Sequence, residues 1–250
     1  METHEIDTDT GYRLVFVHGA GSNPLCWNHQ TDFFAHSEAV TLPGHRLYEF
    51  TDNDPLRSIN DYVLWLNDYL HAERRSGHDK RKVMLVGHSM GGLIALQTAL
   101  QFGEYLGGLV LVGTGARLKV SAPLLDGLRQ DFPATAAMIV ENCFTPSVDP
   151  TVRQANLHTM LQLGKDVAIA DFEACNAFDA MGELEKLTDV PTLVITGNAD
   201  QMAPAKYAHY LADHIKDAKL DLIDAAGHNV MQEKPHEFNR ILDNFLSILV

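Results

Sequence analysis

A serine set between glycines is the residue of this sequence best suited to act as a nucleophile. The hexapeptide GHSMGG at 87–92 follows the apolar run 83–86 and precedes a helix-like apolar segment at 93–100. In this G-x-S-x-G pattern a tight turn from strand to helix lifts the serine oxygen out of the sheet, and the start of the helix favours developing negative charge. Glycines suit the crowded flanks of such a turn. Ser89 is therefore predicted to be a nucleophile, against the simpler alternative of an incidental serine in a glycine-rich turn.

A serine hydroxyl needs a base to take its proton, and His228 is the candidate base. It follows the strand-like run 219–223 through a short turn, which places it at the carboxyl edge of a sheet, where doubly wound proteins bind ligands. The base in turn needs a carboxylate to orient it, and Asp200 follows another strand-like run. The chain order Ser, Asp, His is typical of this pattern. Asp224 is the competing acid, but its closeness in sequence to His228 suits it better to shaping the turn.

Strands that alternate with helices must position these residues. Short β-branched or apolar runs predict strands, and amphipathic or apolar segments between them predict helices. The predicted strands are 13–17, 39–42, 82–86, 109–112, 192–196 and 219–223, and the predicted helices are 60–73, 91–102, 205–215 and 236–249. Such alternation is typical of an α/β fold with a doubly wound, mostly parallel sheet.

The segment 118–188 departs from this alternation because it contains no β-rich run. Four helical patterns occupy it, at 123–130, 134–143, 150–163 and 166–177, separated by prolines and a glycine. We therefore expect residues 1–117 and 189–250 to form the core, and 118–188 to form a helical cap that lies over the sheet.

The composition is that of an ordinary folded protein and argues against several classes of partner. Of 250 residues, 46% are hydrophobic and 21% charged, and the formal charge at pH 7 is −14. This balance excludes disordered and fibrous classes, and the negative charge disfavours nucleic acid and anionic lipid surfaces as partners. Polar residues interrupt the long apolar stretch 83–100, so no membrane span is expected.

Three cysteines without CxxC spacing indicate free thiols in a reducing compartment. The segment 1–12 lacks the basic head and apolar stretch of an export signal, so a cytoplasmic location is expected. The thirteen histidines include neither an H-E-x-x-H motif nor a pair four residues apart, and phosphate-loop and complete dinucleotide motifs are missing from the sequence. The expectation is therefore that the protein uses no metal and no cofactor.

Several motifs together resemble the α/β-hydrolase superfamily over nearly the whole chain, in a serine esterase-like form with a helical cap. In this chain, HGAG at 18–21 with Trp27 resembles the oxyanion loop of the family. The segment LPGH at 42–45 resembles the loop after the next strand of the family. The segment PTLVITG at 191–197 resembles the family's strand that precedes the catalytic acid. Gly227-His228, with the Glu, Pro and Phe that follow, resembles the last segment of the family pattern. The resemblance implies that the N–H groups of Ala20 and Met90 form an oxyanion hole.

Two departures from the family pattern concern neither the serine, the acid nor the base. Only twelve residues precede the first predicted strand, so the amino-terminal hairpin of the family is shortened to at most one extra strand near 4–7. The loop after LPGH reads Arg-Leu-Tyr at 46–48, where the family commonly has a glycine and a serine.

The predicted activity is that of a carboxylesterase that cleaves small to medium hydrophobic esters through an acyl-enzyme on Ser89. A carbon–carbon bond hydrolase, a thioesterase or a perhydrolase would use the same three residues, and a hydrolase-derived ligand receptor would retain them without rapid turnover. The expected partner is thus a small acyl substrate, and the sequence leaves the oligomeric state open. Residues predicted to contact the substrate are Trp27, Met138, Phe144, Phe178 and Val230.

Overall fold

The structure is a computed structural model, and it describes residues 11–46, 56–76 and 81–249. Within these ranges six strands form one parallel sheet in the order β2-β1-β3-β4-β5-β6. The extra strand predicted near 4–7 and part of the 46–48 loop lie outside the described residues. The strands are β1 Tyr12–Val17, β2 Ser37–Val40, β3 Lys82–His88, β4 Leu106–Val112, β5 Thr192–Gly197 and β6 Lys219–Ile223.

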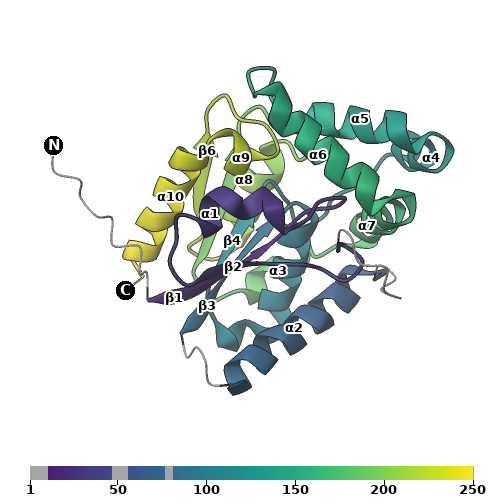
Figure 1. Cartoon of the computed structure of the whole chain (residues 1–250). Helices are drawn as coiled ribbons and strands as arrows, with labels where there is room; N and C mark the ends of the chain where they lie inside the picture. Colours follow the sequence, from purple (N-terminus) through teal and green to yellow (C-terminus); the bar gives the residue numbers. More distant parts are fainter. Residues whose placement is uncertain (1–10, 47–55, 77–80, 250) are drawn as a thin grey trace, which may run out of the picture.

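Helices cover both faces of the sheet, as expected for a doubly wound fold (Figure 1). Residues alternate along β1, where Val15 and Val17 join the core under one helical layer while Leu14 and Phe16 join the other. The first layer contains α2 Ile59–Ser76, α3 Met90–Phe102 and α8 Lys206–His214, and the second contains α9 Val230–Glu233 and α10 Pro235–Ser247. Shorter turns are η1 Pro24–Trp27, α1 Asn28–Thr31, η2 Gly103–Tyr105 and η3 Leu184–Lys186.

Between β4 and β5 the chain forms four helices with a small apolar cluster of their own. They gather beyond one end of the sheet, drawn in teal and green in Figure 1. These helices are α4 Ala122–Gln130, α5 Phe132–Cys143, α6 Pro150–Leu163 and α7 Lys165–Ala177. Asp131 and Asp149 cap α5 and α6 through hydrogen bonds to backbone N–H groups, and prolines occupy the first helical turns. We refer to these four helices as the cap.

Several element boundaries differ from the sequence predictions, and two of the strands show why. The second strand ends at Val40, because the N–H of Leu42 donates to His18 Nε2 rather than to a neighbouring strand. The fourth strand begins at Leu106, three residues early, since two glycines there leave room for neighbouring side chains. A Cβ on Gly108 would lie 2.6 Å from Met84 Cε. The short helix α9 was not predicted.

Within the described part of the chain, no helix has both the length and the apolar character needed to cross a membrane.

Candidate active site

Ser89 lies on a sharp turn between β3 and α3, in a backbone conformation that few non-glycine residues adopt. Its φ is 53° and its ψ is −116°. Such strain persists where the surrounding packing enforces it. A Cβ on Gly87 would lie 2.2 Å from the carbonyl oxygen of Gly91, and one on Gly91 would lie 2.3 Å from that of Val17. Both glycines of the motif are therefore required by close backbone contact, and the turn projects Ser89 beyond the end of the sheet.

Asp200 and His228 form a buried pair beside this turn. Asp200 Oδ2 lies 2.8 Å from His228 Nδ1, and the two residues are 6% and 5% exposed. The other carboxylate oxygen, Oδ1, accepts from the N–H groups of Met202 and Ala203, both at 2.8 Å, which fixes the plane of the acid. With Nδ1 donating to the carboxylate, Nε2 is left free of a proton and can act as a base.

The competing acid, Asp224, has a different role in the structure. It is exposed, and its Oδ1 accepts a hydrogen bond of 2.7 Å from Asn198 Nδ2. Asn198 Oδ1 in turn accepts from the N–H of Ala225. Asp224 therefore shapes the turn after β6, while Asp200 contacts the imidazole of His228.

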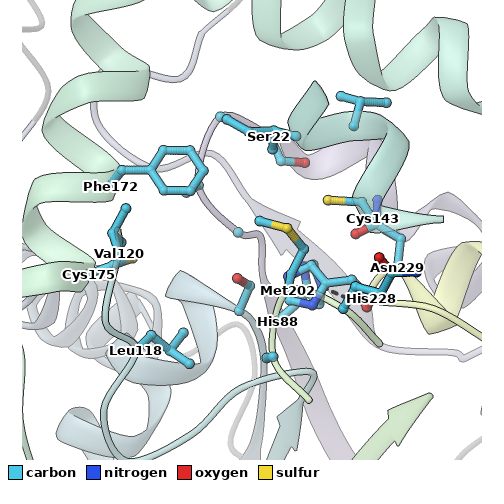
Figure 2. A pocket seen from close by; sticks show the side chains of 18 of the residues that line it. Ser22, His88, Leu118, Val120, Cys143, Phe172, Cys175, Met202, His228 and Asn229 are labelled. Atoms are coloured by element: carbon cyan, nitrogen blue, oxygen red, sulfur yellow. Dashed lines mark hydrogen bonds between the residues drawn. The ribbon is translucent and has the colours of Figure 1, made fainter. Parts of the chain in front are cut away.

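Ser89 and His228 line the same cavity, which has a volume of about 270 Å³. The structure contains no hydrogen bond between their side chains, and such bonds are often long until a substrate is bound. Figure 2 shows Phe172 on one side of this cavity and His228 with Asn229 on the other. The cavity lies between the cap and the carboxyl edge of the sheet, since its lining comes from both.

The loop that carries His228 is hydrogen-bonded directly to the cap. The carbonyl oxygen of Cys143, the last residue of α5, accepts from the N–H groups of His228 at 2.9 Å and Asn229 at 3.2 Å. Glu233 accepts from the N–H groups of Gly227 at 2.8 Å and Thr145 at 3.1 Å. The cap thus sets the position of the candidate base. The sequence gives no sign of the Cys143 contact, because a backbone carbonyl can belong to any residue type.

The predicted oxyanion donors belong to Ala20, in the loop after β1, and to Met90, which follows Ser89 in the chain. Ala20 lines the cavity, and Met90 is the first residue of α3. A first-turn N–H has no acceptor within its own helix, so the N–H of Met90 is available to a ligand. The Met90 side chain is fully buried and plays no part in the lining.

One of the five predicted substrate contacts lines the cavity, and it is Phe144. Trp27 is fully buried under the sheet, with its ring centroid 4.9 Å from that of Phe16. Val230 is also fully buried in that layer, Met138 is 48% exposed on the cap surface, and Phe178 packs against the first core layer. Contrary to the prediction from the sequence, these four side chains do not line this cavity. Their residue types suited a pocket, but type alone does not determine which way a side chain faces.

The thiols that line the cavity are poor competitors for the role of nucleophile. Cys143 and Cys175 are free, and burial raises the pKa of each well above its ordinary value. A thiol reacts as its thiolate, which burial in apolar surroundings disfavours. Among the described residues, no three or more His, Cys, Asp or Glu side chains are grouped so that they could hold a metal ion.

His88, next to the candidate nucleophile, is a buried neutral base. Burial, and then the neighbouring His228, lower its pKa well below the ordinary value. Its Nε2 lies 3.1 Å from the carbonyl oxygen of His228, and within the described residues its Nδ1 has no hydrogen-bond partner. His88 therefore resists protonation in the folded chain.

Because His88 stays unprotonated in the folded chain, we expect the free energy of unfolding to fall as the pH is lowered. In the unfolded chain His88 takes up a proton near pH 6.5, so acidification below that pH favours unfolding, by up to about 1.4 kcal/mol per pH unit for this residue. Urea unfolding of the wild type at pH 7.5, 6.5 and 5.5 should show the fall. The slope should flatten in His88→Gln and persist in a control, His209→Gln, on the exposed face of α8. Equal slopes in all three proteins would contradict the prediction.

Comparison with known proteins decides the family. The model of the alpha/beta hydrolase family matches residues 14–241. The chain belongs to this family. A solved structure described as a thermophilic esterase superposes on this α/β-hydrolase with a TM-score of 0.82 and 31% sequence identity, covering 95% of this chain and 90% of its own.

Two curated relatives of this α/β-hydrolase have different activities in their names. The 2-hydroxy-6-oxo-6-(2'-aminophenyl)hexa-2,4-dienoic acid hydrolase of Metapseudomonas resinovorans is 24% identical over 268 residues, which span 99% of this chain and 88% of the relative. The pimeloyl-[acyl-carrier protein] methyl ester esterase of Neisseria meningitidis is 24% identical over 266 residues, spanning 95% and 94%. The protein is therefore similar to hydrolases that are named for different substrates.

Proposed function

We propose that this α/β-hydrolase is a carboxylesterase in which Ser89 is the nucleophile, His228 the general base and Asp200 the acid that orients it. The observation that carries the proposal is the Asp200–His228 pair, 2.8 Å apart, next to a serine at φ 53° that lines the same cavity. A buried carboxylate–imidazole pair beside a strained serine is the arrangement that activates a hydroxyl.

The reaction follows from these positions. His228 Nε2 takes the proton of Ser89 as Oγ attacks the ester carbonyl carbon, and the carbonyl oxygen becomes an oxyanion. The N–H groups of Ala20 and Met90 donate to that oxyanion, and each donor of this kind contributes about 3 to 4 kcal/mol to the transition state. The imidazolium returns its proton to the leaving alcohol, and a water activated by His228 then releases the acid from Ser89.

The lining of the cavity favours an uncharged acyl group. Most of its apolar residues come from the cap and the segment leading into it: Leu118, Val120, Leu124, Ile139, Val140, Phe144, Met160 and Phe172. The cavity volume of about 270 Å³ suits a small to medium substrate. We further propose that residues 118–188 act as the cap over this cavity, and that the protein works in the cytoplasm, where its free thiols, two of them buried, stay reduced.

A panel of 4-nitrophenyl esters of increasing acyl length tests the function, run beside an acyl thioester and a ring-cleavage dienoate. The proposal expects the highest kcat/KM with an ester of short or medium acyl length. No turnover of any ester, with rapid turnover of the thioester or the dienoate, would overturn it.

Carbon–carbon bond hydrolysis is the second candidate, because the relative from Metapseudomonas resinovorans is named for a dienoic acid substrate and aligns with 99% of this chain. The same three residues would serve it. A kcat/KM for the dienoate above that for every ester would select this activity.

Shortening Phe172 is expected to shift the acyl preference. Phe172 is 8% exposed and lines the cavity from α7, so Phe172→Ala enlarges the space for a chain. The ratio of kcat/KM for 4-nitrophenyl octanoate over butyrate should rise roughly tenfold. Phe178→Ala is the matched control, because Phe178 lies away from the cavity lining and should leave the ratio unchanged. A shift with Phe178→Ala and none with Phe172→Ala would show that the lining is misassigned.

A further inference from the structure

A carboxylate that the proposed chemistry does not use lies buried between the cap and the core. Asp171 belongs to α7, and its side chain is 0% exposed. Among the described residues, the other buried acid is Asp200. Burying a carboxylate is costly unless it is paired and hydrogen-bonded, so its partners indicate what it does.

Three partners from separate segments of the core hold this carboxylate. Asp171 Oδ2 accepts from the backbone N–H of Gly21 at 2.8 Å and lies 2.9 Å from His45 Nε2. Its Oδ1 accepts from the hydroxyl of Tyr62 at 3.2 Å. A single side chain of the cap therefore binds the loop after β1, the loop after β2 and helix α2.

His45 supplies a positive charge to this group. Its Nδ1 lies 2.9 Å from the carbonyl oxygen of Pro43, which can only accept, while its Nε2 faces the carboxylate of Asp171. Both ring nitrogens therefore need a hydrogen, as in an imidazolium. Burial alone lowers the pKa of His45, but Asp171 and the carbonyls of Leu42 and Pro43 outweigh burial and raise it.

The neighbouring His18 remains neutral, and it forms a hydrogen bond with the loop after β2 that carries His45. Burial, and then the charge of His45, lower the pKa of His18 well below its ordinary value. Its Nδ1 lies 3.0 Å from the carbonyl oxygen of Gly19, and its Nε2 accepts from the N–H of Leu42 at 3.3 Å. One nitrogen donates and the other accepts, as a neutral imidazole requires.

The contact of Asp171 with Gly21 matters because of what stands next to Gly21. The N–H that Asp171 binds belongs to the peptide between Ala20 and Gly21, and Ala20 carries one of the proposed oxyanion donors. Gly21 has a φ of +59°, a left-handed conformation that glycine adopts about as readily as a right-handed one, so a contact such as the hydrogen bond to Asp171 is needed to select it. Asp171 therefore sets the orientation of a peptide adjacent to the oxyanion hole.

We propose that Asp171 is a positioning residue for the proposed reaction, through which the cap holds the oxyanion loop in its working conformation. The inference rests on the proposed function, since it assigns Asp171 to the oxyanion hole of that same site. Asp171 touches no reacting atom; it acts through the backbone of Gly21 and Ala20.

Two substitutions separate the role of the acceptor from that of the charge. Asp171→Leu removes the acceptor for Gly21, and we expect kcat for 4-nitrophenyl butyrate to fall about 10- to 100-fold with little change in KM, as for a donor moved out of place. Asp171→Asn keeps an oxygen for Gly21 and should hold kcat within about fivefold of the wild type. Asp166→Asn, on the exposed first turn of α7, is the matched control and should leave kcat unchanged.

A variant that lacks both Asp171 and His45 separates the effect of this pair on stability from its effect on positioning. Asp171→Leu alone leaves His45 buried without its partner and could prevent folding, whereas the double variant Asp171→Leu with His45→Leu buries two apolar side chains instead. The double variant should recover a cooperative thermal transition close to that of the wild type while its kcat stays low. A double variant that is folded and as active as the wild type would overturn the inference.

The activity of the wild type distinguishes failure of the proposed function from failure of the role proposed for Asp171. If the wild type neither hydrolyses the ester nor reacts with a fluorophosphonate at Ser89, the proposed function fails. If the wild type does both and Asp171→Leu or the double variant does both at the same rate, the positioning role of Asp171 fails alone. Loss of kcat in the folded double variant, together with a slower fluorophosphonate reaction, supports it.

Discussion

Replacing Ser89 by alanine is expected to lower kcat for 4-nitrophenyl butyrate by about a millionfold, the loss found when the nucleophile is removed from other serine triads. The substitution deletes one oxygen from a residue at φ 53°, and the glycines that allow this turn remain in place. The fold should therefore persist, because alanine fits the same space. Without Oγ no acyl-enzyme can form, and any remaining rate reflects binding and the oxyanion donors alone.

Ser121→Ala is the matched control for this loss. Ser121 lines the same cavity at the start of the cap, and its hydroxyl makes no capping hydrogen bond to α4. Its kcat should stay within about twofold of the wild type, as for a surface substitution. Mass spectrometry after fluorophosphonate treatment should place the added mass on Ser89 in the wild type and in Ser121→Ala. A label on another residue, or an active Ser89→Ala, would refute the assignment of the nucleophile.

The parts of the site that could be predicted from the sequence are those that a short segment determines. The elbow around Ser89 is one, since a Cβ on Gly87 or Gly91 would lie 2.2 Å or 2.3 Å from a backbone carbonyl oxygen, which leaves room only for glycine. The pairing of Asp200 with His228 is another, because parallel strands bring the loops at their carboxyl ends together at one edge. The G-x-S-x-G motif was sufficient for the elbow, and chain order with strand position was sufficient for the pair.

The lining of the cavity could not be predicted in this way. Trp27 and Val230 are large apolar residues near functional motifs, yet both are fully buried in the layer that contains α9 and α10. Large apolar side chains occur both in a packed core and in the lining of a pocket, so residue type does not show which of the two a given side chain joins. Met160 and Phe172 line the cavity from α6 and α7, and the helical patterns in the sequence leave undetermined which faces of these helices do so.

The contacts between cap and core could not be predicted from the sequence either, and they involve the loops of both the candidate base and the candidate oxyanion donor Ala20. The carbonyl of Cys143 holds the loop of His228, and the carboxylate of Asp171 holds the loop of Ala20 through Gly21. These partners are separated by at least 85 residues in sequence, as in the pair Cys143 and His228. In the proposed function, the cap thus positions the base and one oxyanion donor in addition to enclosing the substrate.

Asp200→Asn is the second substitution with a large expected effect, a fall in kcat of about ten thousandfold. The carboxylate of Asp200 lies 2.8 Å from His228 Nδ1 and accepts two backbone hydrogen bonds on its other oxygen. Those two bonds keep the asparagine oxygen on the side of Met202 and Ala203, so the amide NH₂ faces His228. The imidazole must then place its proton on Nε2, where it can no longer accept the proton of the serine.

Asp224→Asn is the control that decides between the two acids. Asp224 is exposed and accepts from Asn198 at the turn after β6, so its substitution should leave kcat within about twofold and lower thermal stability only slightly. The two variants are measured with 4-nitrophenyl butyrate at pH 8, with circular dichroism to verify folding. A large loss in Asp224→Asn with an active Asp200→Asn would exchange the two roles. Because only Asp200 can hold Nδ1 of His228 protonated in this arrangement, the expected ratio of the two kcat values is about ten thousand to one in favour of Asp224→Asn.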